Sequence, residues 1–304
     1  MAKNDNTVPW AFLRAQAFGI LVSFITRYIV AHVTNMEGML VTAQFFIIPL
    51  VMGIISIWRI DDEYKSVRNI IYLQLANYVG ALLWAIVLFG EGYLCLLIVS
   101  PILLACMLAG GFIGKFIFRR KNKNLNTSLF GTLFLLYVLD VASVRAVNYE
   151  VSDTLIVNAP PSKVWSNVVA FDEVEDPSEF WLFDIGLPKV MKATVNERKV
   201  GGERKCVFEN GIAFDEKIVV YEPGKDLTFD IVKMPEDPEI IGHINLKRGQ
   251  FKLNDNGDGT TTLEGVSWYD LKVFPAWYYN IWAESITRNV HLRAMKHIKK
   301  LSER

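Results

Sequence analysis

Hydrophobic and polar positions follow two different patterns along this chain of 304 residues. Before about residue 145 the apolar residues form long runs with almost no charge, and after that point charged residues regularly interrupt them. A helix that crosses a lipid bilayer needs about 20 mostly apolar residues. Four runs meet this requirement, so we expect four membrane spans, at residues 11–33, 39–58, 70–89 and 93–114.

A fifth apolar run, 129–144, is shorter and contains Asp140. It could cross the bilayer if Asp140 lies near one end or faces other helices, and we favour this interpretation. The alternative is a helix that lies along the membrane surface. The choice between them decides on which side of the membrane the rest of the chain lies.

The distribution of basic residues predicts the orientation of these spans, because cytoplasmic loops carry an excess of Lys and Arg. The predicted loops 34–38 and 90–92 contain none. Nine basic residues lie on the other side of the predicted spans, at Lys3, Arg59, Lys65, Arg68, Lys115, Arg119, Arg120, Lys121 and Lys123. We therefore expect an integral membrane protein with a cytoplasmic N-terminus. The C-terminal half is then periplasmic or extracellular if 129–144 crosses, and cytoplasmic if it does not.

Several predicted spans contain polar residues at membrane depth, namely Arg27, Gln44, Gln74, Asn77 and Asp140. They form no recognisable transport motif. We therefore expect hydrogen bonds between helices rather than a path for ions or solutes. Pro49 and Pro101 are expected to kink the helices that contain them, because proline cannot donate a backbone hydrogen bond.

From residue 147 the pattern predicts strands that are buried on one face. Residues 148–157 alternate apolar and polar residues, and Pro160 and Pro161 then end a strand and can begin a helix. Turn signals such as Asn210-Gly211 separate the further segments. These segments are predicted as strands at 189–199, 203–210, 213–222, 226–233, 243–254 and 260–270.

The last segment, 275–303, has the pattern of a long helix. Apolar residues step by four along it and predict a buried stripe of Tyr278, Trp282, Ile286, Val290, Ala294 and Ile298. This order of elements predicts one curved antiparallel sheet packed against the C-terminal helix, with a cavity between them. The fold class is thus an α-helical transmembrane domain, 1–146, followed by an α+β domain, 147–304.

The two halves of the chain carry opposite net charges, although the net charge of the whole chain is zero. The 32 basic and 32 acidic residues cancel, yet residues 1–150 carry +4 and residues 151–304 carry −4. The C-terminal half lacks the basic surface that nucleic-acid binding needs, so no nucleic-acid partner is expected. The three cysteines, Cys95, Cys106 and Cys206, form no disulfide framework or metal-binding spacing. Neither a metal nor a cofactor is expected.

The C-terminal half resembles a known family in the order of its sequence patterns. The stretch YEVSDTLIVNAPPSKVW resembles an opening strand, double-proline turn and tryptophan-bearing helix, and EFWLFDIGLP, RGQFKL and TTLEGVSWYDL follow in the family's order. Together with the final helix, these resemble the helix-grip domains of the SRPBCC superfamily, which includes START and polyketide-cyclase-like proteins. The resemblance covers residues 147–304 and points to a bacterial subgroup that joins this domain to membrane segments. It implies a bacterial inner membrane location and a deep apolar pocket.

The same resemblance, together with the aromatic content of this half, indicates candidate ligand-binding residues in the cavity. Glu216 could orient a ligand hydroxyl or transfer a proton, or it could be an ordinary paired strand carboxylate. His243 and Tyr269 are further possible proton-transfer groups. No convincing Ser/His/Asp triad is evident, and no residue is assigned as catalytic. The cavity candidates are Trp165, Trp181, Phe208, Phe214, Glu216, Phe229, His243, Phe251, Trp268, Tyr278 and Trp282.

Three functions follow as hypotheses, because a fold does not determine a function. The first is a membrane-anchored protein that binds or transfers a lipid or another hydrophobic small molecule. The second is an enzyme, a cyclase, isomerase or hydrolase, that acts on a lipid-like or polyketide-like substrate. The third is a non-catalytic ligand sensor or assembly module. The expected partners are the bilayer and a hydrophobic molecule, and association with another copy or another membrane protein is left open.

Overall fold

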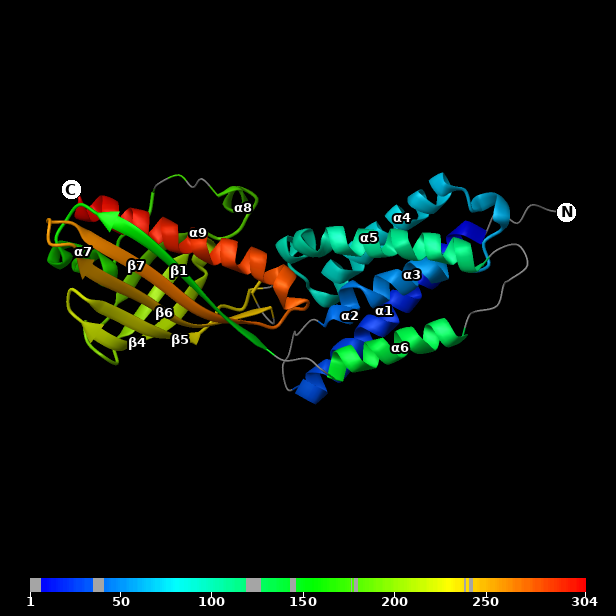
Figure 1. Cartoon of the computed structure of the whole chain (residues 1–304), viewed down its shortest axis with the longest axis horizontal. Coiled ribbons are helices and arrows are strands. Elements are labelled where there is room, and N and C mark those ends of the chain that lie inside the picture. Colours follow the sequence, from blue (N-terminus) through cyan, green and yellow to red (C-terminus); the bar gives the residue numbers. More distant parts are fainter. Residues whose placement is uncertain are drawn as a thin grey trace. The chain divides into compact units, whose positions relative to one another are not determined.

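The structure is a computed structural model that describes residues 7–34, 41–118, 127–142, 146–175, 177, 180–237, 239–240 and 243–304. The chain forms two compact units (Figure 1). The helical unit comprises Met1–Arg145 and Val273–Pro275. The sheet unit comprises Ala146–Lys272 and Ala276–Arg304.

The helical unit contains six described α-helices and one short 3-10 helix. Three of the α-helices are long and apolar enough to cross a membrane, over Thr7–His32, Val67–Phe89 and Tyr93–Ile117. The elements are α1 (Thr7–Thr34), α2 (Thr42–Phe45), α3 (Ile47–Ile57), η1 (Asp62–Tyr64), α4 (Val67–Phe89), α5 (Tyr93–Ile117) and α6 (Thr127–Ala142).

The second predicted span, 39–58, is not one continuous helix. It is interrupted at Phe46, which separates α2 from α3. Pro49 explains the position of the break, because its ring would clash with the carbonyl of residue 45 in a continuous helix. Pro101 has a different effect: α5 continues through it, and the Ser100 hydroxyl donates to the Leu97 carbonyl at 3.0 Å. That carbonyl is the acceptor a residue other than proline at 101 would use.

The number of membrane spans remains a prediction. The fifth run forms α6, whose 16 residues are fewer than a perpendicular crossing usually needs. The basic residues Lys3, Arg119, Arg120, Lys121 and Lys123 lie outside the described residues, as do residues 35–38 of the predicted loop 34–38. The predicted orientation therefore also remains a prediction.

Hydrogen bonds between helices are confirmed for Gln74 and Asn77. Gln74 on α4 donates to the Ser56 hydroxyl on α3 at 2.8 Å. The Asn77 side-chain oxygen accepts from Gln16 on α1 at 2.9 Å, and Trp84 donates to the Gln16 oxygen at 3.0 Å. This buried network joins α1, α3 and α4.

The other polar residues at membrane depth have different partners. Asp140 on α6 accepts from the backbone N–H of Ala43 at 2.6 Å, which links α6 to α2. Arg27 forms an ion pair with Glu91. For Gln44 the expectation was wrong: its side-chain oxygen caps its own helix by accepting from the backbone N–H of Val41 at 3.0 Å.

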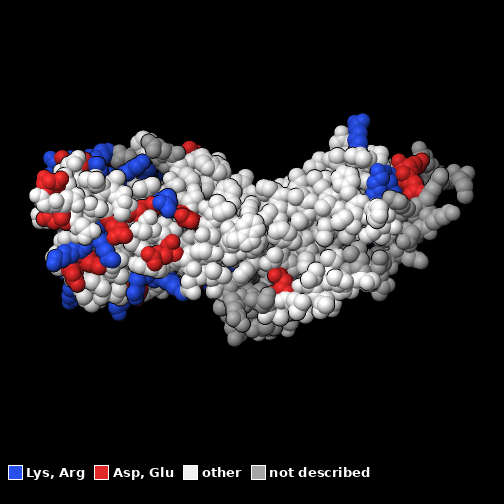
Figure 2. Space-filling view, viewed as in Figure 1, with Lys and Arg blue, Asp and Glu red and all other residues white. Residues whose placement is uncertain are grey.

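Large apolar side chains are exposed along α1, α4, α5 and α6. Val87 is 77% exposed, and Tyr28 and Phe116 are comparably open. In the view of Figure 2, most of the drawn face of the helical unit is free of charged residues, which gather mainly at its right-hand end, whereas that of the sheet unit carries many of both signs throughout. Contiguous exposed apolar surface of this kind is rare in water-soluble monomers and typical of lipid-facing helices.

The sheet unit is one seven-stranded antiparallel sheet with a long C-terminal helix, a helix-grip fold (Figure 1). The strand order is β1-β7-β6-β5-β4-β3-β2, so the two earliest strands form opposite edges. The strands are β1 (Val147–Val157), β2 (Val190–Val195), β3 (Glu203–Phe208), β4 (Ala213–Glu222), β5 (Asp226–Lys233), β6 (Ile244–Asp255) and β7 (Thr261–Leu271). The helical elements are α7 (Pro161–Val169), α8 (Trp181–Asp184), η2 (Glu209–Gly211) and α9 (Ala276–Ser302).

The predicted strands of this half are all present, and most bounds agree within two residues. The exception is the predicted strand 189–199, because β2 ends at Val195 and residues 196–202 form the turn to β3. The predicted strands 213–222 and 226–233 match β4 and β5 residue for residue. Pro161 occupies the first turn of α7, where its missing N–H has no helical partner to lose. The turn glycines Gly211 and Gly224 adopt positive φ angles of 76° and 75°, which other residues rarely adopt.

Helix α9 packs on the concave face of the sheet. Ala294, Met295 and Ile298 join the core formed by strand residues such as Leu263 and Phe251. The helix comes close to β7 because Gly265 lacks a side chain: a Cβ there would lie 2.9 Å from the Met295 sulfur. This packing positions the cavity described below.

The buried stripe of α9 differs from the prediction. Ala294 and Ile298 are buried as expected, but the predicted residues nearer the N-terminus are only half-buried. Thr287 and His291 are buried instead. The apolar spacing could not reveal this shift, because a polar side chain with a hydrogen-bonding partner can occupy a buried position.

Candidate functional site

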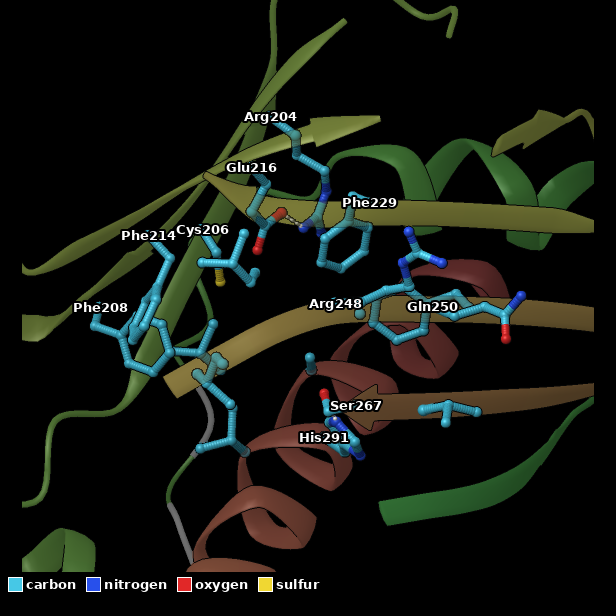
Figure 3. Close-up of a pocket in the computed structure, with 18 of the residues that line it drawn as sticks. Arg204, Cys206, Phe208, Phe214, Glu216, Phe229, Arg248, Gln250, Ser267 and His291 are labelled. Carbon is cyan, nitrogen blue, oxygen red and sulfur yellow. Dashed lines mark hydrogen bonds and ion pairs between the residues drawn. The ribbon is translucent and has the colours of Figure 1, made fainter. Parts of the chain in front are cut away.

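A cavity of about 100 Å³ lies between the concave face of the sheet and α9. The side chains around it are predominantly apolar, with polar groups at separate places on the wall (Figure 3). The lining residues come from β2 to β7, α9 and the segment after α7. The principal ones are Phe171, Arg204, Cys206, Phe208, Phe214, Glu216, Phe229, Ile231, Gly249, Phe251, Ser267, Val290, His291 and Ala294.

Strand alternation places one set of these residues on the same face. Residues two positions apart in a strand point the same way, so Arg204 and Cys206 on β3 share a face with Phe214 and Glu216 on β4. The register confirms this, because Arg204 pairs with Glu216 and Cys206 pairs with Phe214. The local sequence therefore brings a charged pair into an aromatic wall.

Arg204 and Glu216 form a buried ion pair, with side chains only 2% and 4% exposed. The guanidinium also donates from Nε to the Val169 carbonyl at 3.2 Å and lies 4.7 Å from the centre of the Phe229 ring. Burial raises the pKa of the Glu216 carboxyl, and the adjacent Arg204 opposes that rise. Glu216 is thus a paired strand carboxylate at the cavity wall, and its position in the cavity agrees with the prediction.

Cys206 lies beside this ion pair (Figure 3). Burial raises the pKa of its thiol to about 12, and the Glu216 carboxylate adds to the rise. The thiolate is the nucleophilic form of cysteine. Cys206 therefore contributes a neutral, weakly polar group to the wall at ordinary pH.

A second polar group occupies the wall formed by β7 and α9 (Figure 3). The Ser267 hydroxyl lies 2.7 Å from His291 Nε2, and His291 Nδ1 lies 3.2 Å from Asp153 Oδ2. The other Asp153 oxygen accepts from Arg288 Nη1 at 2.6 Å. Three segments of the chain, β1, β7 and α9, supply these residues.

Sequence reasoning missed this group, because its members lie far apart in the chain and match no motif. One signal was present: Asp153 occupies a buried-face position of β1, between Val151 and Leu155. A carboxylate at such a position needs a partner. The pattern could not indicate that His291 would be this partner, since 138 residues separate the two.

Five of the eleven predicted cavity residues line the cavity, namely Phe208, Phe214, Glu216, Phe229 and Phe251. Two tryptophans have other environments. Trp165 packs in the core with its ring edge-on to Tyr221 at 5.2 Å. Trp181 on α8 is 50% exposed.

The remaining four predicted residues are also absent from the lining. His243 is buried just before β6, and Trp268 donates to Glu150 at 2.8 Å. Tyr278 and Trp282 are half-buried on the first half of α9. Their spacing suggested a cavity wall, but the cavity borders the later turns of the helix, from Val290 onward.

Tyr269, a candidate for proton transfer, is a core residue. Its hydroxyl donates to Asn280 at 2.9 Å, and its ring stacks on Tyr149. Burial raises the pKa of this hydroxyl to about 12. Within the described part of the chain, no group of three His, Cys, Asp or Glu residues could hold a metal ion.

No family model matches the sequence, and no curated protein matches it. Among solved structures, the chain is similar to norcoclaurine synthase from Thalictrum flavum at 15% identity, over 51% of this chain and 87% of that one, with a TM-score of 0.36. It is similar to a protein of Mesorhizobium loti at 18% identity, over 50% and 96% of the two chains, with a TM-score of 0.34. A protein of Nitrosospira multiformis has 21% identity over 51% and 100%, with a TM-score of 0.33. At this level of similarity, the description of the fold rests on the strand order and on α9.

Proposed function

We propose that this chain is a membrane-anchored protein that binds a small hydrophobic molecule with a polar end in the cavity of its sheet unit. The observation that carries the proposal is the cavity itself: aromatic walls, with polar groups at two separate places. A few polar groups that orient a ligand within an apolar pocket are typical of small-molecule sites. Membrane anchoring is supported by the three long apolar helices and their exposed apolar side chains.

The size of the cavity limits the ligand. A volume of about 100 Å³ is smaller than the roughly 150 Å³ apolar cavity that takes up benzene. Pockets for drug-sized ligands span about 300–1,000 Å³. The ligand is thus either small or enters as one end of a longer molecule. A lipid chain would have to displace wall side chains, and transfer to or from the bilayer would then depend on that opening.

The binding test uses the full chain in detergent and 2,2,2-trifluoroethanol, a probe smaller than benzene with one apolar trifluoromethyl group and one hydroxyl, followed by fluorine NMR. Ala294→Phe fills the cavity from α9, and we expect it to weaken probe binding by at least about 10-fold, about 1.4 kcal/mol. Lys296→Phe adds the same ring at an exposed position of the same helix and serves as the matched control. Partition of the probe into micelles affects all three proteins alike.

Equal probe binding by the wild type and Ala294→Phe would refute a ligand site in this cavity. Native mass spectrometry of the chain from its host membrane would identify the natural ligand. We expect a hydrophobic molecule that the wild type retains and Ala294→Phe does not.

We further propose that the sheet unit is an SRPBCC-type domain on the outer side of a bacterial inner membrane. The sequence resemblance and the helix-grip fold support the first part, and the distribution of basic residues supports the second. The test is Arg304→Cys, at an exposed position, in a chain whose Cys95, Cys106 and Cys206 are replaced by Ser. We expect a membrane-impermeant maleimide to label intact spheroplasts. Labelling only after permeabilisation would place the domain in the cytoplasm.

A further inference from the structure

The residues Asp153, His291 and Ser267 form a continuous relay that ends at the cavity. The Ser267 Oγ to His291 Nε2 distance of 2.7 Å and the His291 Nδ1 to Asp153 Oδ2 distance of 3.2 Å are within hydrogen-bonding range. Both Ser267 and His291 line the cavity, whereas Asp153 lies behind them and is only 5% exposed. This is the connectivity of a serine nucleophile, its base and the carboxylate that orients the base.

The hydrogen-bond network assigns the proton positions in this relay. Arg288 donates to one Asp153 oxygen at 2.6 Å, so the carboxylate is ionised and its other oxygen is an acceptor. His291 Nδ1 must then carry a proton to donate to that oxygen. In the neutral imidazole this leaves a lone pair on Nε2 facing the Ser267 hydroxyl. The hydroxyl proton of Ser267 is therefore directed at His291 Nε2, which can accept it as a base.

A buried histidine with two hydrogen bonds can also be a purely structural element. A structural hydrogen-bond network of this kind would need no open space next to the serine. Here Ser267 borders the cavity. Gly249 is the direct cross-strand neighbour of Ser267 on β6, and a Cβ there would lie 2.5 Å from the Phe229 ring. The Phe229 ring thus lies over β6 at the position next to Ser267. The relay therefore faces an apolar space in which a ligand would meet the hydroxyl.

We propose that Ser267 is an activated nucleophile and that the ligands of this cavity include esters of small apolar acids. This deepens the proposed function and rests on it. Ser267 Oγ would attack the ester carbonyl carbon, and its proton would pass to His291 Nε2. As the acyl–oxygen bond breaks, His291 would return this proton to the departing alcohol, leaving an acyl group on Ser267. Water would then release the acid and regenerate the serine, with His291 again accepting and returning a proton.

The position of Ser267 in the sheet sets the expected rate. Strand β7 is paired on both sides, with Val151 of β1 and Gly249 of β6 opposite Ser267. The backbone amides beside Ser267 therefore take part in the hydrogen bonds of the sheet. They do not form the pair of free N–H donors that usually stabilises the negatively charged carbonyl oxygen of the tetrahedral intermediate. Loss of one such donor costs about 10²–10³ in rate. We therefore expect slow turnover, so covalent modification of Ser267 is the more sensitive measurement.

The test treats the full chain in detergent with methanesulfonyl fluoride, a small reagent suited to the cavity. Ser267 Oγ would displace fluoride from sulfur and transfer its proton to His291. Peptide mass spectrometry measures the rate at each serine. We expect the Ser267 peptide to be modified at least about 100-fold faster than the peptide with Ser152, an exposed serine on β1. Ser152→Ala should leave the Ser267 rate unchanged, and Ser267→Ala should remove the fast modification.

Two conservative variants separate activation from structure. His291→Asn removes the base, and Asp153→Asn removes the carboxylate that positions it. Each should slow modification of Ser267 by at least about 100-fold. Both should still unfold cooperatively in urea, which separates loss of reactivity from loss of the fold. The initial release of 4-nitrophenolate from 4-nitrophenyl acetate should fall in parallel in both variants.

The outcomes distinguish this inference from the proposed function. If the wild type binds the probe but modifies Ser267 no faster than Ser152, the relay is structural and the inference is wrong. The inference is also wrong if Asp153→Asn and His291→Asn unfold cooperatively and their Ser267 reacts as fast as in the wild type. If Ala294→Phe binds the probe as well as the wild type, the cavity proposal fails, whatever the reactivity of Ser267.

Discussion

The two units bury polar side chains in different settings. In the helical unit the buried polar side chains Gln16, Gln74 and Asn77 are neutral, and the surface around them is apolar. Gln16 on α1 donates to Asn77 on α4, and Gln74 on α4 donates to Ser56 on α3. In the sheet unit, the buried polar groups include charges, Arg204–Glu216 and Asp153, and they lie at or behind a cavity wall. The surface there is charged (Figure 2).

This difference reflects what each network does. If the helical unit lies in a bilayer, as proposed, lipid provides no hydrophobic driving force between its helices, and hydrogen bonds between neutral amides would help to hold them together. Buried charges are expensive, and replacing them with apolar residues often leaves a protein as stable or more so. Their presence around a cavity is therefore better explained by ligand recognition or chemistry than by stability. The variants below test this contrast.

The largest effect is expected from breaking the buried ion pair in the sheet unit. Glu216→Gln leaves the Arg204 cation without a counter-charge, and we expect a loss of about 3–5 kcal/mol in the free energy of unfolding, measured by urea denaturation. Asp230→Asn breaks the exposed Arg248–Asp230 pair of the same sheet and is the control, with less than about 1 kcal/mol expected. Similar losses for both variants would contradict the contrast between buried and exposed charges.

A double replacement sharpens the same point. Arg204→Met with Glu216→Leu removes both charges and should recover most of the stability lost in Glu216→Gln. Probe binding in the cavity should nevertheless weaken, because one of the two polar places on its wall is lost. A double variant that is as unstable as Glu216→Gln would indicate that the pair is needed for folding.

The next effect concerns the reactivity of Cys206 in the cavity wall. With its pKa raised to about 12, this thiol is almost entirely protonated at pH 9, whereas an ordinary cysteine with a pKa of 9.0 is half ionised. We expect iodoacetamide to alkylate Cys206 several hundred-fold more slowly in the folded chain than in urea, in a chain with Cys95 and Cys106 replaced by Ser. The folded rate should rise about tenfold per pH unit toward pH 12.

The sign of the accompanying stability change follows from the same shift. The unfolded thiol loses its proton near pH 9 and the folded one near pH 12, so stability falls as pH rises through this window. A Cys206→Ser control should lack this part of the fall. Equal alkylation rates in folded and unfolded chain at pH 9 would show that the thiol is accessible and ionised in the cavity.

The smallest effect is expected from the neutral network of the helical unit. Gln74→Leu removes the hydrogen bond to Ser56 between α4 and α3, and we expect a loss of about 0.6 kcal/mol and at most about 1.7 kcal/mol in detergent unfolding. Asn69→Leu, at an exposed position of α4, is the matched control and should change stability by no more than a few tenths. A loss as large as that of Glu216→Gln would remove the distinction between the two networks.

The sequence determined the local elements of the chain. Long uncharged runs predicted the helices, although Phe46 divides the second run into α2 and α3. Alternation and turn glycines predicted most strands to within two residues, and the Pro160-Pro161 pair predicted the start of α7. These signals are local, because strand alternation and helix length depend on neighbouring residues alone. The family resemblance and the aromatic content, not these local signals, indicated Phe208, Phe214, Glu216, Phe229 and Phe251 as cavity residues.

Only the tertiary structure decided which distant polar residues meet. Asp153 contacts His291 because β1 and α9 pack together at the concave face. His291 contacts Ser267 because β7 pairs with β1 and so also lies next to α9. The same packing shifted the buried stripe of α9 and left Trp181 and Trp268 outside the cavity wall. Hydrophobic spacing predicts which face of an element is buried, but a hydrogen bond depends on two atoms meeting within about 3 Å. Whether two such atoms meet depends on how the whole chain folds, so it cannot be predicted from any single segment.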